Sequence, residues 1–160
     1  MNDVSSAIAS GFKHHYQRII ERIHGLVDPL TDDQIWSRPY PYGNSIGHLL
    51  LHLTGNLSYY IGAQIGATGY VRDRPLEFTD DSRLPKATLL GNFDGAVATM
   101  TAALEKQSDA DWAAPYTAKG MEDVGNRFTA FLRCAEHLSH HTGQIIYLCK
   151  EIDVGAGRKA

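Results

Sequence analysis

The sequence predicts an all-α protein, a four-helix bundle with long loops after its second and third helices. Four long segments carry apolar residues at intervals of three and four, the spacing that lines one face of a helix. No segment shows, with any strength, the strict alternation of a half-buried strand. Amphipathic helices bury their apolar faces against one another, which favours a bundle. The 160 residues, 43% of them hydrophobic, fit one domain that spans residues 1–160.

The first long helix is expected over residues 5–27, and a short helix over 30–36 follows it. Thr31 can cap the short helix, and Gln34, three residues further on, completes a capping box. The first helix should bury a stripe formed by Ile8, Phe12, His15, Ile19, Ile23 and Leu26.

The second long helix is expected to begin at Asn44 or Ser45, either of which can cap it, and to reach about Gly66. An irregular polar loop over 67–82 follows. Within this loop the run Arg72-Asp73-Arg74 is either solvated or able to recognise an acidic group near a site. The buried stripe of the helix should consist of Ile46, Leu49, Leu50, Leu53, Leu57, Tyr60 and Ile61.

The third long helix is expected from about Leu84 to Gln107, before a second long loop over 108–125 in which a short hairpin is weakly signalled. The fourth helix should begin near Asn126 and reach about Ile152. Its buried side is predicted to contain Phe128, Phe131, Leu132, Ala135, Leu138, Ile145, Tyr147, Leu148 and Ile152.

Composition excludes several classes of partner. The formal net charge is −3 and the pI is near 6.2, which disfavours nucleic-acid binding. No apolar run reaches the roughly 18–20 residues of a membrane span, and no signal-peptide pattern is seen. Cys134 and Cys149 lie roughly 22 Å apart along one predicted helix, so they cannot form a disulfide with each other. We expect a cytoplasmic protein with reduced thiols and with no nucleic-acid or membrane partner.

Histidines gather on two of the predicted helices. His48 and His52 lie on the second helix, and His137, His140 and His141 on the fourth. His137 and His141 are four residues apart, so both rings lie on one helix face and can share a divalent metal. A third ligand could come from the second helix. Spacing alone does not choose between His48 and His52, which are one turn apart on one face.

The histidines lie in two motifs, Asn44–Asn56 (Asn-Ser-Ile-Gly-His-Leu-Leu-Leu-His-Leu-Thr-Gly-Asn) and His137–Ile145 (His-Leu-Ser-His-His-Thr-Gly-Gln-Ile). Both motifs resemble those of the DinB-like (DinB/YfiT) superfamily of bacterial metal-binding four-helix bundles. The loop segment Arg72–Phe78 is similar to one branch of that superfamily. The resemblance extends over about residues 5–152 and implies a three-histidine metal site formed by His52, His137 and His141. His140 is expected to be a surface or neighbouring residue outside the ligand set.

Three neutral imidazoles would leave the metal its full charge and open coordination positions for water or a substrate. The ion could be zinc, nickel, iron or copper. Cys134 lies three residues before His137 and could approach the same face as a fourth ligand. Each ligand ring should donate its other N–H to an acceptor. Nearby candidates for that acceptor are Glu136, Asn56 and Gln144.

The resemblance implies a metal-dependent enzyme that transfers or isomerises with a low-molecular-weight thiol. In such enzymes the metal binds the thiol as thiolate, which attacks an electrophile. The expected partners are therefore a small-molecule thiol and an electrophilic substrate. A metal-dependent hydrolase and a non-catalytic, stress-associated metal- or ligand-binding protein are the alternatives. Homodimerisation is expected because it is common in families of this kind.

Overall fold

The computed structural model describes residues 4–157, and the long helices there form a bundle. Within these residues no strand forms, and the one β-bridge joins Pro115 to Asn126. The long helices are α1 (Val4–Val27), α3 (Ile46–Leu57), α5 (Lys86–Glu105) and α7 (Arg127–Gly157). The short ones are α2 (Asp32–Trp36), α4 (Leu76–Thr79), α6 (Asp109–Ala113) and the π-helix η1 (Ser58–Ala63), which continues α3. The all-α prediction is confirmed.

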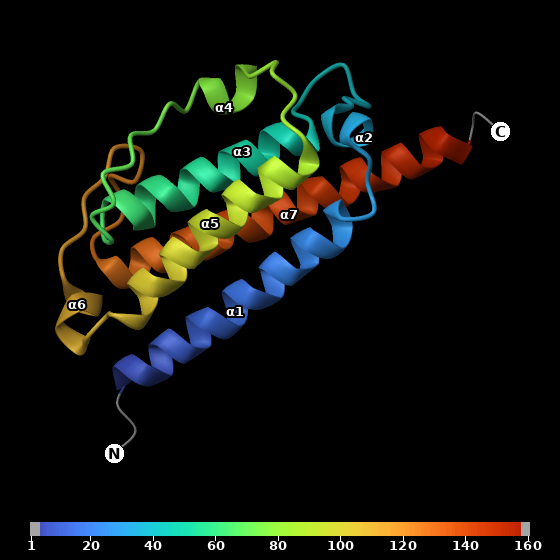
Figure 1. The fold of residues 1–160 in the computed structure, drawn as a ribbon. Coiled ribbons are helices and arrows are strands. Elements are labelled where there is room, and N and C mark those ends of the chain that lie inside the picture. Colours follow the sequence, from blue (N-terminus) through green and yellow to red (C-terminus); the bar gives the residue numbers. More distant parts are fainter. Residues whose placement is uncertain (1–3, 158–160) are drawn as a thin grey trace.

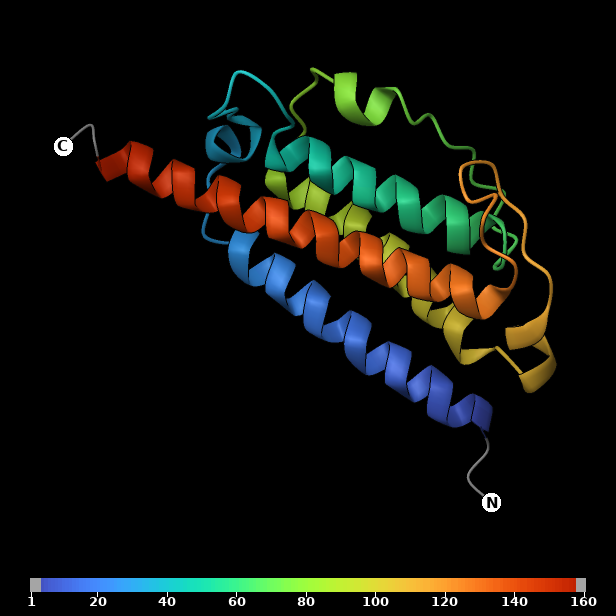
Figure 2. The same cartoon turned by 180° about the vertical axis from the view of Figure 1, so that it is seen from behind.

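The four long helices pack in a ring. α1 contacts α5 and α7, and α3 contacts the same two helices from the other side. α1 and α7 run in one direction, while α3 and α5 run in the other (Figure 1). The parallel pair α3 and α5 therefore needs a long crossover connection, which carries α4 back along α3 (Figures 1 and 2). This crossover brings residues of the first long loop onto the histidine-bearing face of α3.

Local signals in the sequence account for the helix ends. Thr31 and Gln34 form the predicted capping box of α2, and Ser45, not Asn44, caps α3 by accepting from the His48 backbone N–H. The indole N–H of Trp36 donates to the carbonyl of Leu84, just before α5, at 2.9 Å. This hydrogen bond holds α2 against the start of α5.

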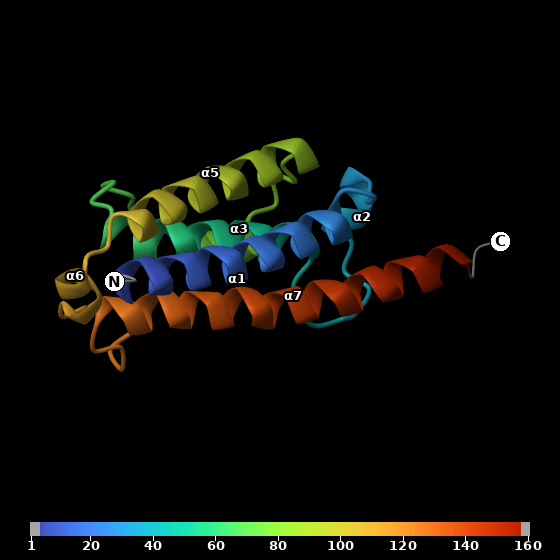
Figure 3. The same ribbon diagram turned by 90° about the horizontal axis from the view of Figure 1, so that it is seen from below.

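Four predicted segments differ from the structure: the second helix, the two long loops and the fourth helix. The second helix was expected as one α-helix to Gly66, but its last turns adopt the wider π-helix η1. The two long loops contain α4 and α6, and only the isolated β-bridge stands where a hairpin was signalled. α7 runs five residues beyond the predicted end at Ile152 and extends past the other helices (Figure 3).

The buried stripes were predicted with local errors. On α1 the neighbouring Tyr16 is buried in place of His15, and its hydroxyl donates to the Phe131 carbonyl at 2.5 Å. On α7 three residues expected in the core are exposed: Phe128, Leu132 and Tyr147. Both cysteines are buried as free thiols. Across residues 4–157, no helix has the length and apolar character that crossing a membrane would require.

Candidate metal centre

Three histidines from two helices meet at one point between α3 and α7. One ring nitrogen of each of His52, His137 and His141 lies within 4.8 Å of the other two. Nε2 of His52 and Nε2 of His137 are 2.8 Å apart. The three ring centroids are separated by 4.9, 4.9 and 4.4 Å, with each pair nearly perpendicular. These are the three histidines that the family resemblance selects.

A carboxylate from the crossover fixes the orientation of the His52 ring. Oε2 of Glu77, on α4, lies 2.7 Å from Nδ1 of His52. A carboxylate at this distance accepts, so Nδ1 carries the proton and Nε2 keeps its lone pair for a ligand. Arg72 donates to both carboxylate oxygens, at 2.6 and 2.9 Å, and the Arg72 and Glu77 side chains are each only 7% exposed. The buried charges of this pair therefore compensate each other.

Gln144 orients His141 in the same manner. Its Oε1 lies 2.7 Å from Nδ1 of His141, three residues earlier on α7. Because an amide oxygen only accepts, Nδ1 of His141 also carries the proton and Nε2 is left free. Two of the three rings are thus held in the tautomer that presents Nε2 to the common point.

The remaining candidates lie outside this group. Both ring nitrogens of His48 are engaged, with Nδ1 2.6 Å from Ser45 Oγ and Nε2 3.0 Å from the Asp80 carbonyl. His140 is exposed, as expected, and its ring lies beside His141. Cys134 is fully buried and is not part of the group, and burial raises the pKa of its thiol to about 12.

Burial favours the neutral form of two of the three rings, those of His137 and His141. Burial, together with the proximity of His141 and His52, lowers the pKa of His137 to about 3. Burial likewise lowers the pKa of His141 to about 4, against the hydrogen bond with Gln144. Burial alone would raise the pKa of Glu77, but hydrogen bonds from His52 and Arg72 outweigh it and hold that pKa below its ordinary value. Two neutral rings beside an ionised carboxylate suit a cation.

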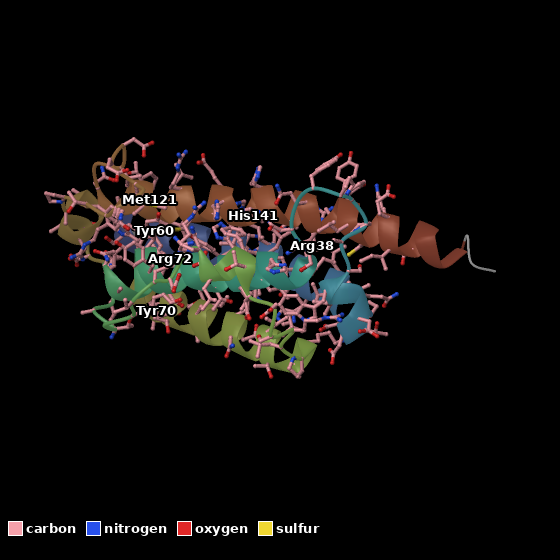
Figure 4. All side chains as sticks on the ribbon, turned by 90° about the horizontal axis from the view of Figure 1, so that it is seen from above. Arg38, Tyr60, Tyr70, Arg72, Met121 and His141 are labelled. Atoms are coloured by element: carbon pink, nitrogen blue, oxygen red, sulfur yellow. The ribbon has the colours of Figure 1, made fainter. Side chains whose placement is uncertain are left out.

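A cavity of about 950 Å³ opens from the histidines toward one end of the bundle. Its walls come from α3, η1, α7 and the loops that precede α4 and α7. Those two loops lie side by side at that end in both views of the fold (Figures 1 and 2). Tyr60, Arg72 and Met121 line the cavity and lie together toward that end, with His141 nearer the middle of the bundle (Figure 4). A small molecule can therefore reach the histidine group.

Comparison with known families agrees with this geometry. The family model described as the DinB superfamily matches residues 15–145. The chain belongs to the DinB superfamily. The fold is similar to the crystal structure of a conserved protein from Enterococcus faecalis, with a TM-score of 0.71 and 16% sequence identity. The match covers 95% of this chain and 98% of that one. Among curated proteins, none matches the chain significantly.

In this DinB-superfamily protein, the acceptors for the ligand rings were only partly predicted. Gln144 is confirmed as the acceptor for the ring N–H of His141. Glu136 instead lies 3.9 Å from Arg133 on the exposed face of α7, and Asn56 takes no ring N–H. Glu77 was not anticipated, although its charge and its place in the Arg72–Phe78 segment could have drawn attention to it. The solvated interpretation of that loop is wrong for Arg72 and holds for the exposed Asp73 and Arg74.

Two glycines, Gly55 and Gly143, lie beside the site, and they differ in what a side chain would meet there. A Cβ on Gly55 would lie well inside van der Waals contact with Oε1 of Glu77. Gly55 therefore admits the buried carboxylate rather than a neighbouring helix. A Cβ on Gly143 would meet nothing within 4 Å, so close helix packing does not require glycine there.

Proposed function

We propose that the chain binds one divalent metal ion through Nε2 of His52, His137 and His141. The observation that carries this proposal is the convergence of three ring nitrogens within 4.8 Å, two of them oriented by acceptors on Nδ1. Membership of a metal-binding superfamily supports it. Imidazole ligation suits zinc, nickel or iron.

With three neutral ligands, the ion would keep open positions that face the cavity, and it would supply Lewis acidity there. A site that opens onto a cavity of this size suits chemistry on a small molecule better than a purely structural role. We therefore propose a metal-dependent thiol transferase or isomerase that acts in the cytoplasm. The thiol partner and the electrophile would both enter through the cavity.

The transfer step is a nucleophilic substitution. The thiol loses its proton to solvent, and its sulfur lone pair forms a new bond to an electrophilic carbon. The bond from that carbon to the leaving group breaks, and the leaving group departs with the bonding pair. The buried thiol of Cys134 takes no part, because its high pKa keeps it protonated.

Metal content tests the site directly. The protein is stripped of metal with a chelator and then supplied with zinc, nickel or iron. It should retain about one ion per chain, measured by inductively coupled plasma mass spectrometry. His52→Ala, His137→Ala and His141→Ala should each lose most of that metal, while His140→Ala should keep it, because His140 is exposed and outside the group. Equal metal in all four variants would refute the proposed ligands.

Thermal melting of the same variants separates the functional site from a structural one. The apolar core extends along all four long helices, so His52→Ala should lower the melting temperature of the metal-free protein only slightly. Loss of the fold on metal removal would favour the non-catalytic, structural alternative. A panel of small thiols against electrophiles then tests transfer, and absence of turnover with every pair would contradict it.

A further inference from the structure

More cationic than anionic side chains line the cavity beside the histidines. Four of the lining side chains are cationic, and one, Glu136, carries a carboxylate. Arg72 is neutralised by Glu77, and Arg133 lies near two carboxylates, at 3.7 and 3.9 Å. Among residues 4–157, Arg74 and Lys119 form no close ion pair: Arg74 lies over the Phe78 ring, and Lys119 interacts with Glu122 only at longer range. They come from the two neighbouring loops that form the walls at that end. A cavity with this balance attracts an anion.

The inner part of the cavity holds an unpaired acceptor. Asn56 lies on α3 one turn after His52, lines the cavity and is only 3% exposed. Among the described residues none donates to its Oδ1, although that atom is buried. A buried carbonyl oxygen without a donor is destabilising, so such an atom is usually paired. Because Asn56 lines the cavity one turn from His52, a ligand bound there can supply the missing donor after a small rotation of the buried amide.

We propose that the cavity is selective for a small molecule that bears a carboxylate and, some distance from it, a hydrogen-bond donor. The carboxylate contacts Arg74 and Lys119, and the donor, an N–H, O–H or S–H group, pairs with Oδ1 of Asn56. This inference rests on the proposed function and gives the class of its thiol or substrate, which is an anionic one. The volume of about 950 Å³ accommodates a molecule of several such groups.

Paired probes test the charge selectivity. Glutathione and its diethyl ester share a thiol and amide N–H groups, but only glutathione carries two free carboxylates. Calorimetric titration should show glutathione binding at least about tenfold more tightly than the ester, in both the zinc-loaded and the metal-free protein. The double variant R74Q/K119Q should abolish the difference. The control R22Q/K106Q removes two exposed cations away from the cavity and should preserve it.

Equal affinity for the two probes, or a preference that survives R74Q/K119Q, would overturn the proposed carboxylate contact. The result is separable from the metal proposal, because the comparison is also made without metal and metal content is measured independently. A protein that fails to bind metal can still show the carboxylate preference.

Asn56→Leu tests the inner contact. Leucine has a similar size and no polar atom, so the metal-free variant should melt at the same or a higher temperature than the parent. Its affinity for glutathione should fall several-fold, because the acceptor is lost. A lower melting temperature, or unchanged glutathione binding, would place Asn56 in the fold rather than at the ligand and overturn this contact.

Discussion

Single residues around the histidines decide how well a metal can be held, and Gln144 gives the cleanest test. Its side chain is exposed and contacts His141 and, more weakly, the exposed His140, so Gln144→Ala should leave the melting temperature of the metal-free protein almost unchanged. Loss of the Nδ1 acceptor should weaken metal affinity about 10- to 100-fold. Competition with a chromophoric chelator measures the change. Gln144→Glu retains an acceptor and should restore affinity, while Ser139→Ala, exposed on the same helix, should have no effect. Parent-like affinity in Gln144→Ala would show that His141 needs no such support.

At the residue scale, local contacts were predictable and distant ones were not. His137, His141 and Gln144 occupy consecutive turns of one helix, so their spacing alone places them together. Glu77 is 25 residues from His52, and their contact depends on the path of the crossover. The choice of His52 over His48 came from the family resemblance. The structure gives it a physical reason, because a ring nitrogen of His52 lies beside those of His137 and His141, while both nitrogens of His48 contact residues outside that group.

Gly55, on α3, leaves the space that the carboxylate of Glu77, on the crossover element α4, occupies. Gly55→Ala should displace Glu77, loosen its contacts with His52 and Arg72, and cost about 1–3 kcal/mol of unfolding free energy. Metal affinity should fall with it. Gly143→Ala is the matched control, because its added methyl group meets nothing and helix propensity should stabilise α7 by up to ~1 kcal/mol. Urea denaturation and metal titration measure both effects. If Gly55→Ala is as stable as the parent, Glu77 does not occupy this position.

At the element scale, the four long helices were predictable because each carries a repeating apolar stripe over several turns. α4 and α6 have four and five residues, too few for a period to be recognised. The π-helix η1 shares its residue types with an α-helix, and only its hydrogen bonding differs. The exposed Leu132 and Tyr147 show that an apolar residue near the edge of a stripe need not face the core.

At the scale of the whole molecule, the geometry of the histidine site depends on the packing of the four long helices around it. The bundle core runs through all four long helices, and the histidines lie where α3 meets α7 beside the crossover. Helix packing holds these rings in position. Their lowered pKa values therefore need no oppositely charged side chain beside each ring. The homodimer stays a prediction, which sedimentation equilibrium of the full chain would test.

Acid should destabilise the metal-free protein through these rings. The pKa values of His137 and His141 in the folded state, about 3 and about 4, lie below the value of about 6.5 for a free histidine. The unfolded chain therefore binds more protons below about pH 6.5, and the free energy of unfolding falls as the pH is lowered from there toward 4. The lowered pKa of Glu77 adds to the loss near the acid end, because its stabilising contribution disappears as the carboxylate is protonated.

Melting temperatures of the metal-free protein between pH 7 and pH 4 measure this dependence. The double variant H137Q/H141Q carries no titrating ring at these positions, so its melting temperature should fall less steeply. H14Q/H15Q removes two exposed histidines and should follow the parent. Bound metal favours the folded state and competes with protons for the same nitrogens, so the loaded parent should melt higher than the metal-free one at pH 6 and lose that advantage as acid displaces the ion. Parallel curves for the parent and H137Q/H141Q would contradict the lowered pKa values of the two rings.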